Sequence, residues 1–294
     1  MSVTSALYTG VSGLLNNGEA MNVIGNNIAN VNTVGFKQGR TLFSDLLSQN
    51  VGNNSQIGKG VQLQAVQNVF VQGSSQSSEN VTDLSIQGNS FFALKAPATA
   101  APVATQDAAF LSRAGAFQVD NGLNLVNPDG YQVLDTAGNP IQFLNSAADP
   151  TTDFSKVIKI EPNGLITYLA TDGITQNYYS GSGATGVPAN AANAAVVERV
   201  AVVTASDPTA LTKVGGSLFQ STTASGVSTD PFTLAANQPN GISEKILSNT
   251  LEQSNVDMAN EFVKMIVTQR AYSANSKTIT TADQMTQEVL NLVR

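Results

Sequence analysis

The N-terminal part of the chain carries the apolar pattern of one long helix. From residue 4 to about residue 31, apolar side chains recur at spacings of four and three residues, which places them on one helix face. The series is Val3, Leu7, Val11, Leu14, Met21 and Ile28, with Gly18 and Gly25 in the same register. We expect the helix to end near Gly35, which adopts the left-handed conformation before Phe36.

A second helical pattern runs from residue 256 to residue 293. Its apolar positions keep the same register and comprise Met258, Phe262, Met265, Tyr272, Ile279, Leu290 and Val293. Ser254 and Asn255 precede it, and both are residue types that cap helix N-termini. Residues 1–32 and 256–294 are therefore predicted to pair as a coiled coil, either parallel or antiparallel.

Between these helices the pattern changes to that of β-strands. Short apolar or alternating runs such as "DLSIQG" and "IKIEPNGLITYL" are separated by turn residues. Asn163-Gly164 has the composition of a tight hairpin turn. The predicted fold class is α+β, with long terminal helices and a central all-β domain. Its expected parts are the β domain at residues 76–240 with a loop excursion at 172–195, connecting segments at 33–75 and 241–255, and polar linkers at 50–58 and 73–80.

Charged side chains are scarce, especially in the N-terminal helix. They make up 12% of the chain, whose net charge is −7, and Glu19 is the only charge in that helix. A helix alone in water normally carries a charged face. If the two helices pair within one molecule, the pairing explains why one face of each helix is apolar. Contacts between molecules also explain the missing charged face, and we favour that interpretation.

The composition gives little support for catalysis or nucleic-acid binding. The chain has no histidine and no cysteine, so the commonest general base and the thiolate metal ligands are missing. Residues 181–186, "GSGATG", fit a dinucleotide-binding motif, but Pro188 follows and no helical pattern does, so we expect a loop. No basic cluster is present. We expect neither an enzyme nor a cofactor or metal site.

No stretch reaches the roughly 18 consecutive apolar residues that cross a membrane as a helix. The first residues, "MSVTSALYTG", lack the basic region and apolar stretch of a secretory signal peptide. We expect a cytosolic protein, or one that a dedicated exporter releases without such a signal.

Four stretches resemble the bacterial flagellar rod and hook axial proteins. Residues 6–37, "ALYTGVSGL…MNVIGNNIANVNTVGFK", resemble their N-terminal motif, and residues 251–285 resemble their C-terminal motif. "TDLSIQGNSFFAL" and "FLSRAGAFQVDNGLNLVNPDGYQVL" resemble their central β domain. The resemblance implies a non-catalytic subunit of a helical tube. The paired terminal helices would line an export channel, and the β domain would lie outside.

The resemblance also implies partners and a location. The subunit would form a homopolymer and contact flagellar rod and hook–filament junction proteins. Its assembly would use a hook cap and the flagellar type III export apparatus, which delivers subunits without a Sec-type signal to the hook or basal body, outside the cell. Neither nucleic acid nor a transmembrane segment is implied.

Within this family, two local features favour a hook subunit. "VIGNNIAN" is more similar to hook proteins than to rod proteins, and the segment between "FSDLLSQ" and "GKGVQL" is short, as in hook proteins. The extra outer domain of larger hook proteins is missing, as it is in distal-rod proteins. We expect a hook subunit, part of a flexible joint that transmits torque from rod to filament. The alternative is a subunit of the rigid distal rod.

The residues expected to pack between subunits lie on the terminal helices. They are Leu7, Val11, Leu14, Met21, Asn26, Asn27, Ile28 and Asn30 on the first helix, and Met258, Phe262, Met265, Tyr272, Ile279 and Leu290 on the second. Asn22, Asn26 and Asn30 form a stripe that either bonds a neighbouring helix or faces water in the channel. A binding module or adhesin on a coiled coil is a second class of function, and an enzyme is a third.

Overall fold

The computed structural model describes residues 3–46, 49–52, 55–97, 102–144, 151–190, 193, 197–242 and 244–292. The chain divides into two compact units. The helical unit comprises Met1–Val31, Lys37–Val69 and Val256–Arg294, and the β unit comprises Asn32–Phe36 and Phe70–Asn255. Terminal helices and a central β domain agree with the predicted mixture of α and β structure.

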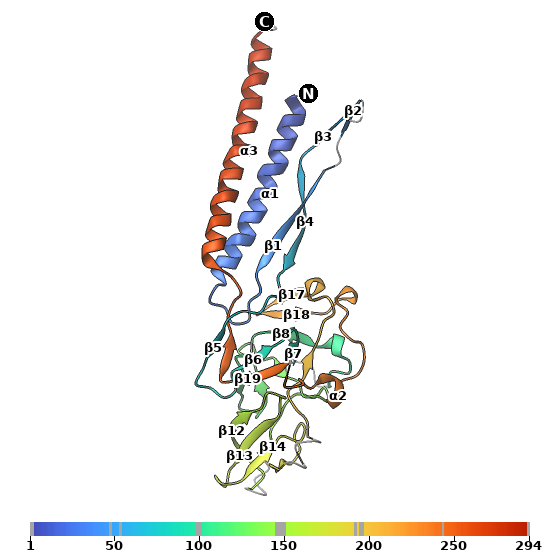
Figure 1. Cartoon of the computed structure of the whole chain (residues 1–294), viewed down its shortest axis with the longest axis vertical. Coiled ribbons are helices and arrows are strands. Elements are labelled where there is room, and N and C mark those ends of the chain that lie inside the picture. Colours follow the sequence, from blue (N-terminus) through green and yellow to red (C-terminus); the bar gives the residue numbers. More distant parts are fainter. Residues whose placement is uncertain are drawn as a thin grey trace. The chain divides into compact units, whose positions relative to one another are not determined.

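Two long helices make up most of the helical unit. α1 spans Val3–Ala29 and α3 spans Met258–Leu292, and they lie side by side in opposite directions (Figure 1). Gly10 of α1 lies against Ile279 of α3, whereas Asn27, near the other end of α1, bonds to Glu261. These contacts fix the antiparallel arrangement.

The helix ends differ in detail from the prediction. α1 ends at Ala29, several residues before Gly35. The N-terminus of α3 is capped by Asp257 rather than by Ser254 or Asn255, because Asp257 Oδ1 accepts a hydrogen bond from the Ala259 amide at 2.9 Å. Both differences are shifts of a few residues at helix termini, where patterns of apolar residues carry little information. The predicted position Val293 lies outside the described residues.

A β-hairpin belongs to the same unit as the helices. β1 (Gly39–Asp45) pairs antiparallel with β4 (Val61–Asn68), and β2 (Gln49–Gly52) pairs with β3 (Ser55–Ile57). The hairpin is joined to α1, since Asn16 Nδ2 donates to the Val61 carbonyl oxygen at 2.8 Å.

The structure therefore groups much of the predicted connecting segment 33–75 with the helices, and the linker predicted at 50–58 is wrong where β2 and β3 form. Strands β5 (Ser75–Ser77) and β20 (Thr250–Glu252) pair with each other, so the linker predicted at 73–80 also contains a strand. The alternation of apolar and polar residues in "VQLQAVQN" of β4 is the sequence feature that could have indicated a strand in this segment.

The β unit is built around one large sheet and a smaller one. The large sheet has the strand order β17-β18-β8-β7-β11-β10-β9, with β16 also pairing with β7. Its strands are β7 (Phe91–Lys95), β8 (Phe110–Ser112), β9 (Gln118–Val119), β10 (Leu125–Val126), β11 (Gln132–Val133), β16 (Val202–Val203), β17 (Thr212–Gly215) and β18 (Leu218–Gln220). Nearby, β6 (Leu84–Gln87) pairs with β19 (Lys245–Ser248), and the short helix α2 spans Leu234–Asn237.

The smaller sheet has the order β12-β13-β14-β15, formed by Phe154–Ile160, Ile166–Ala170, Gln176–Tyr178 and Val187–Pro188. Its first hairpin turns at the predicted Asn163-Gly164. The predicted loop excursion at 172–195 is wrong for β14 and β15, which complete this sheet. The motif at 181–186 lies between those two strands and leads directly into β15, so it is a loop, as predicted.

Two clusters of buried apolar side chains form the core of the β unit. One cluster gathers around Phe92, Leu94 and Tyr168, and the other around Phe91, Leu111 and Phe219. Phe91 and Phe92 are neighbours on β7 and point to opposite faces, as successive residues of a strand must. β7 therefore supplies both clusters at once.

A buried carboxyl group lies within this core. Asp135 is fully buried, and its Oδ1 accepts hydrogen bonds from the backbone amides of Ala137 and Asn139, at 3.0 and 2.9 Å. Its Oδ2 accepts a hydrogen bond from the Tyr179 hydroxyl at 3.0 Å. Burial raises the pKa of Asp135 from 3.8 to about 6, and these hydrogen bonds oppose that shift.

Because the pKa of Asp135 is raised, part of the chain's folding stability is expected to depend on pH. Between about pH 4 and about pH 6, the folded chain keeps a proton on Asp135 that the unfolded chain has released. The stabilising contribution of Asp135 to the free energy of unfolding is therefore fully present below about pH 4. It falls by about 3 kcal/mol as the pH rises through about 6. Urea unfolding measured across this pH range is expected to show a smaller fall in the free energy of unfolding for Asp135→Asn than for the wild type. Equal pH profiles for the two proteins would contradict the raised pKa of Asp135.

Candidate functional site: the paired terminal helices

Two glycine residues of α1 lie directly against α3. A Cβ atom on Gly10 would lie 3.0 Å from Ile279 Cγ1, and one on Gly13 would lie 2.6 Å from Asn275 Nδ2. Ala20 and Ile24 continue the buried line along α1. Because glycine and alanine bring the backbones together, these positions set the distance between the two helices.

The contact line is rotated by about one residue from the predicted seam. Leu7, Leu14, Met21 and Ile28 are only half-buried, and Val11 is 42% exposed. On α3, Met265 and Ile279 are half-buried, whereas Met258, Phe262, Tyr272 and Leu290 are exposed. A search for large apolar side chains misses a seam made of glycine and alanine, and therefore selects the positions beside it.

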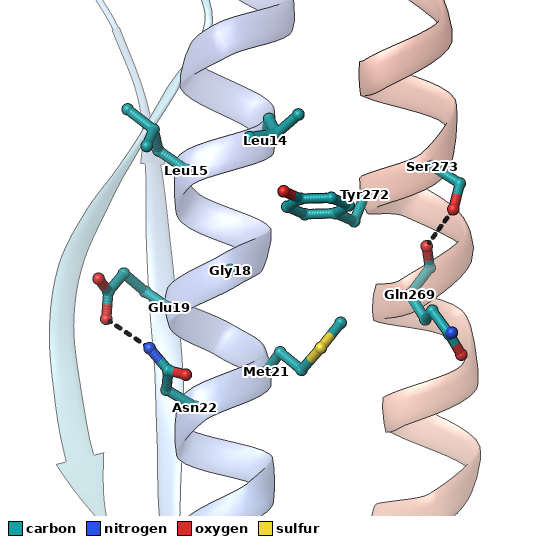
Figure 2. Close-up of a pocket in the computed structure, with 9 residues that line it drawn as sticks. All are labelled: Leu14, Leu15, Gly18, Glu19, Met21, Asn22, Gln269, Tyr272 and Ser273. Carbon is teal, nitrogen blue, oxygen red and sulfur yellow. Dashed lines mark hydrogen bonds between the residues drawn. The ribbon is translucent and has the colours of Figure 1, made fainter.

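Three of the predicted residues do meet at a groove between the helices. Figure 2 shows Leu14 and Met21 of α1 pointing toward α3, with the Tyr272 ring of α3 directed toward α1. The groove has a volume of about 600 Å³. Its rim is polar: Asn22 donates to Glu19, and the Ser273 hydroxyl donates to the Gln269 carbonyl oxygen (Figure 2). The groove thus offers an apolar floor to a side chain from outside.

Asn27 joins the three segments of the helical unit. Its Nδ2 donates to the Gly39 carbonyl oxygen at 2.8 Å and to Glu261 Oε2 at 3.0 Å, while its Oδ1 accepts from the Gly39 amide at 2.9 Å. Lys264 Nζ lies 2.6 Å from the other oxygen of Glu261. Asn27 and Glu261 are each 1% exposed. One amide therefore ties α1, α3 and the start of β1 together.

The predicted asparagine stripe has a different role in the isolated chain. Asn30, which directly follows α1, donates from Nδ2 to the Asn26 carbonyl oxygen and to Asn26 Oδ1, both within the same chain segment. Asn22 donates to Glu19, also on α1. The cross-linking asparagine is Asn27, which lies beside the stripe. Two sequence features could have identified Asn27. It is an uncharged polar residue on the buried side of an apolar helix, and a rare charged residue, Glu261, stands at the start of the other helix.

Replacing Asn27 with aspartate is expected to destabilise the helical unit by about 2 kcal/mol. The new side chain loses two donated hydrogen bonds and places a second carboxylate beside buried Glu261. The measurement is urea unfolding followed by helical circular dichroism. Asn26→Asp is the matched control, because Asn26 is exposed and its Oδ1 needs only to accept. Equal losses in both variants would show that Asn27 is not a special position.

The predicted exit residues Gly35 and Phe36 belong to the β unit. Gly35 has a φ of 68°, which confirms the predicted left-handed conformation, and its amide donates to the Glu252 carbonyl oxygen at 2.8 Å. Phe36 is buried, and Lys213 Nζ lies 4.1 Å from the centre of its ring. These residues anchor the segment that follows α1.

Much apolar surface on α3 has no partner among the described residues. Phe262, Val263, Ile266 and Val267 are 47–60% exposed and follow one another on adjoining helical turns. Since Gly10 lies opposite Ile279, Leu290 lies beyond the start of α1, and it is 65% exposed. Exposed apolar surface of this extent is typical of contacts with other protein chains.

The described helices include none with both the length and the apolar character needed to cross a membrane. In the same residues, His, Cys, Asp and Glu side chains form no group of three or more that would hold a metal ion. What the geometry does offer is a long helix pair with uncovered apolar faces, joined to a folded β unit. Those features fit a structural subunit that packs against other protein chains better than they fit a catalytic site.

Comparisons with known proteins place this subunit in a family. Residues 7–37 match the family described as flagella basal body rod protein, and residues 247–292 match the C-terminal family of flagellar basal body rod FlgEFG proteins. The flagellar basal-body rod protein FlgG of Bacillus subtilis is 34% identical, over 98% of this chain and 99% of that protein. FlgG of Borreliella burgdorferi is 29% identical, over 98% of each chain.

Hook proteins match over a shorter length. The flagellar hook protein FlgE of Borreliella burgdorferi is 38% identical, over 49% of this chain and 34% of that protein. The chain belongs to the flagellar rod and hook family of axial proteins, and it is a structural subunit of the flagellum.

Proposed function

We propose that this chain is a subunit of the distal rod, the rigid drive shaft of the flagellar basal body. The observation that carries the proposal is the whole-length similarity to basal-body rod proteins, which covers 98% of the chain. The hook proteins are similar over about half of it. The distal-rod alternative is therefore better supported than the hook subunit that the sequence pattern favours.

The two local features that favoured the hook carry less weight than this overall match. "VIGNNIAN" lies within residues 7–37, a region that matches a rod-protein family as a whole. A few side chains inside such a shared motif distinguish members weakly. The similarity to rod proteins, by contrast, extends through the central β unit, where the larger members of the family differ.

In the proposed assembly, the apolar faces left open in one chain are covered by neighbouring copies. Phe262 and Leu290 are exposed on α3, and Val11 is exposed on α1. The groove lined by Leu14, Met21 and Tyr272 would receive a side chain from the next subunit. Within the tube, α1 and α3 would wind as a coiled coil around an export channel. This hydrophobic burial would drive polymerisation.

The role we propose is structural rather than catalytic, and the partners follow from it. Copies of the chain would contact one another, proximal rod subunits below and hook subunits above. Subunits would reach the growing tip through the flagellar export apparatus. The low charge of the chain supports such contacts, because neutral polar surfaces are less costly to desolvate than charged ones.

Antibody labelling of isolated hook–basal bodies tests the proposal. Gold particles directed against the β unit are expected along the distal part of the rod. Labelling along the curved hook would overturn the distal-rod assignment and restore the hook. A strain producing the chain with an added epitope tag, labelled by the tag, controls for the accessibility of the antibody's own epitope.

A further inference from the structure

The polypeptide passes between the two units four times, after residues 31, 36, 69 and 255. Within the β unit, these passages are carried by three short segments: residues 32–36, 70–75 and 250–255. All three segments meet at Glu252, which is itself part of the third segment. Its side chain is 0% exposed.

Each oxygen acceptor of Glu252 serves a different partner. The backbone carbonyl oxygen accepts from the Gly35 amide at 2.8 Å, which ties the first segment. Oε1 accepts from the Gly73 amide at 2.9 Å, which ties the second segment. Oε2 lies 3.4 Å from Nη1 of Arg113, with which it forms an ion pair. A single buried residue thus holds both other segments and a cation.

Further bonds connect the same segments to one another. The Asn255 amide donates to the Phe36 carbonyl oxygen at 3.4 Å, and Asn255 Nδ2 donates to the Val71 carbonyl oxygen at 3.1 Å. The Gln253 amide donates to the Ser74 carbonyl oxygen at 2.8 Å. A side chain at Gly73 would overlap the Gln253 carbonyl oxygen, so only glycine allows this approach.

Arg113 connects the junction to the core of the β unit. Its Nη2 donates to the Gly88 carbonyl oxygen at 2.6 Å, and its guanidinium lies 5.0 Å from the centre of the Phe91 ring. Phe91 belongs to one of the two core clusters. The Arg113 side chain is 3% exposed. A charge pair this far from water is stable only while both partners are present.

We propose that Arg113 and Glu252 are positioning residues that clamp the three connecting segments into one cooperative junction of the β unit. Load entering the β unit through any connection is then shared by all of them and passed to the core at Phe91. The mechanical use of the clamp rests on the proposed function, because a drive shaft must resist twisting within each subunit. The clamp itself is a property of the isolated chain.

Hydrogen exchange of the purified full-length chain tests the clamp. Glu252→Gln keeps an oxygen for the Gly73 amide but leaves Arg113 without its carboxylate. Amide exchange in residues 33–36, 71–75 and 250–255 is expected to accelerate together by at least about tenfold, while β7 and β8 keep their protection. Glu161→Gln is the matched control, since it removes the exposed ion pair with Lys159 and is expected to change nothing in those segments.

If the Glu252→Gln variant does not fold, amide hydrogen exchange of the wild-type chain at low urea concentrations tests the clamp instead. The three segments are expected to open in one step, separate from the opening of β7 and β8. Segments that open independently, or acceleration confined to 71–75 in Glu252→Gln, would overturn the clamp. Labelling of the hook rather than the rod would overturn the proposed function and leave this result standing, so the two failures are distinguishable.

Discussion

Replacing Gly35 with alanine is expected to lower the free energy of unfolding of the β unit by about 4 kcal/mol. Two effects add. The φ of 68° costs a residue with a side chain about 1–2 kcal/mol. In addition, the new methyl group would lie 2.6 Å from the carbonyl carbon of Arg113 and against the backbone of Ala114, which cannot move without disturbing the strands beside it. Urea unfolding at neutral pH measures the loss.

Gly173→Ala separates the two effects. Gly173 also has a positive φ, of 75°, but nothing lies within 4 Å of the position its Cβ would take. The variant is expected to lose only the conformational part, about 1 kcal/mol. If Gly35→Ala loses no more than Gly173→Ala, the close approach between residues 35 and 113–114 does not hold the segment in place.

Replacing Phe262 with aspartate is expected to abolish polymerisation and motility while leaving the single chain folded. Phe262 is 47% exposed in the isolated chain, so the substitution removes little of the chain's own core. In the assembled tube, the same position would bury a carboxylate without a partner, a change that costs several kcal/mol for every subunit contact. Electron microscopy of the purified variant and a swimming assay measure the result.

Two companion variants sharpen that test. Phe262→Leu keeps an apolar side chain and is expected to retain assembly. Leu14→Asp places a charge at the floor of the groove and is expected to block assembly as Phe262→Asp does. Normal tubes from Phe262→Asp would mean that this face of α3 is not an interface.

The elements of the fold were predictable where apolar side chains repeat over many residues. α1 and α3 follow from such repeats, and the hairpin at Asn163-Gly164 follows from a turn that needs glycine. The β1–β4 hairpin was missed because Arg40, Asp45, Gln62 and Gln64 occupy outward positions, a polar composition equally typical of a linker. β14 and β15 were missed because strands of 3 and 2 residues are too short to show an alternating pattern.

The contact line between the helices could be predicted only in part. Leu14, Met21 and Tyr272 do meet at the groove, but Gly10 and Gly13 lie where α3 leaves little room for a side chain. A sequence pattern records which residues are apolar and does not record which of them a partner helix can approach. The bonds of Asn27 depend on Gly39 and Glu261, residues that come together only in the folded chain.

A deletion strain distinguishes a distal-rod subunit from a hook subunit. Basal bodies purified from cells lacking this chain are to be imaged by electron microscopy, with the complemented strain as the control. The distal-rod assignment predicts basal bodies whose rod stops short. Basal bodies with a complete rod and no hook would contradict it and identify the chain as a hook subunit.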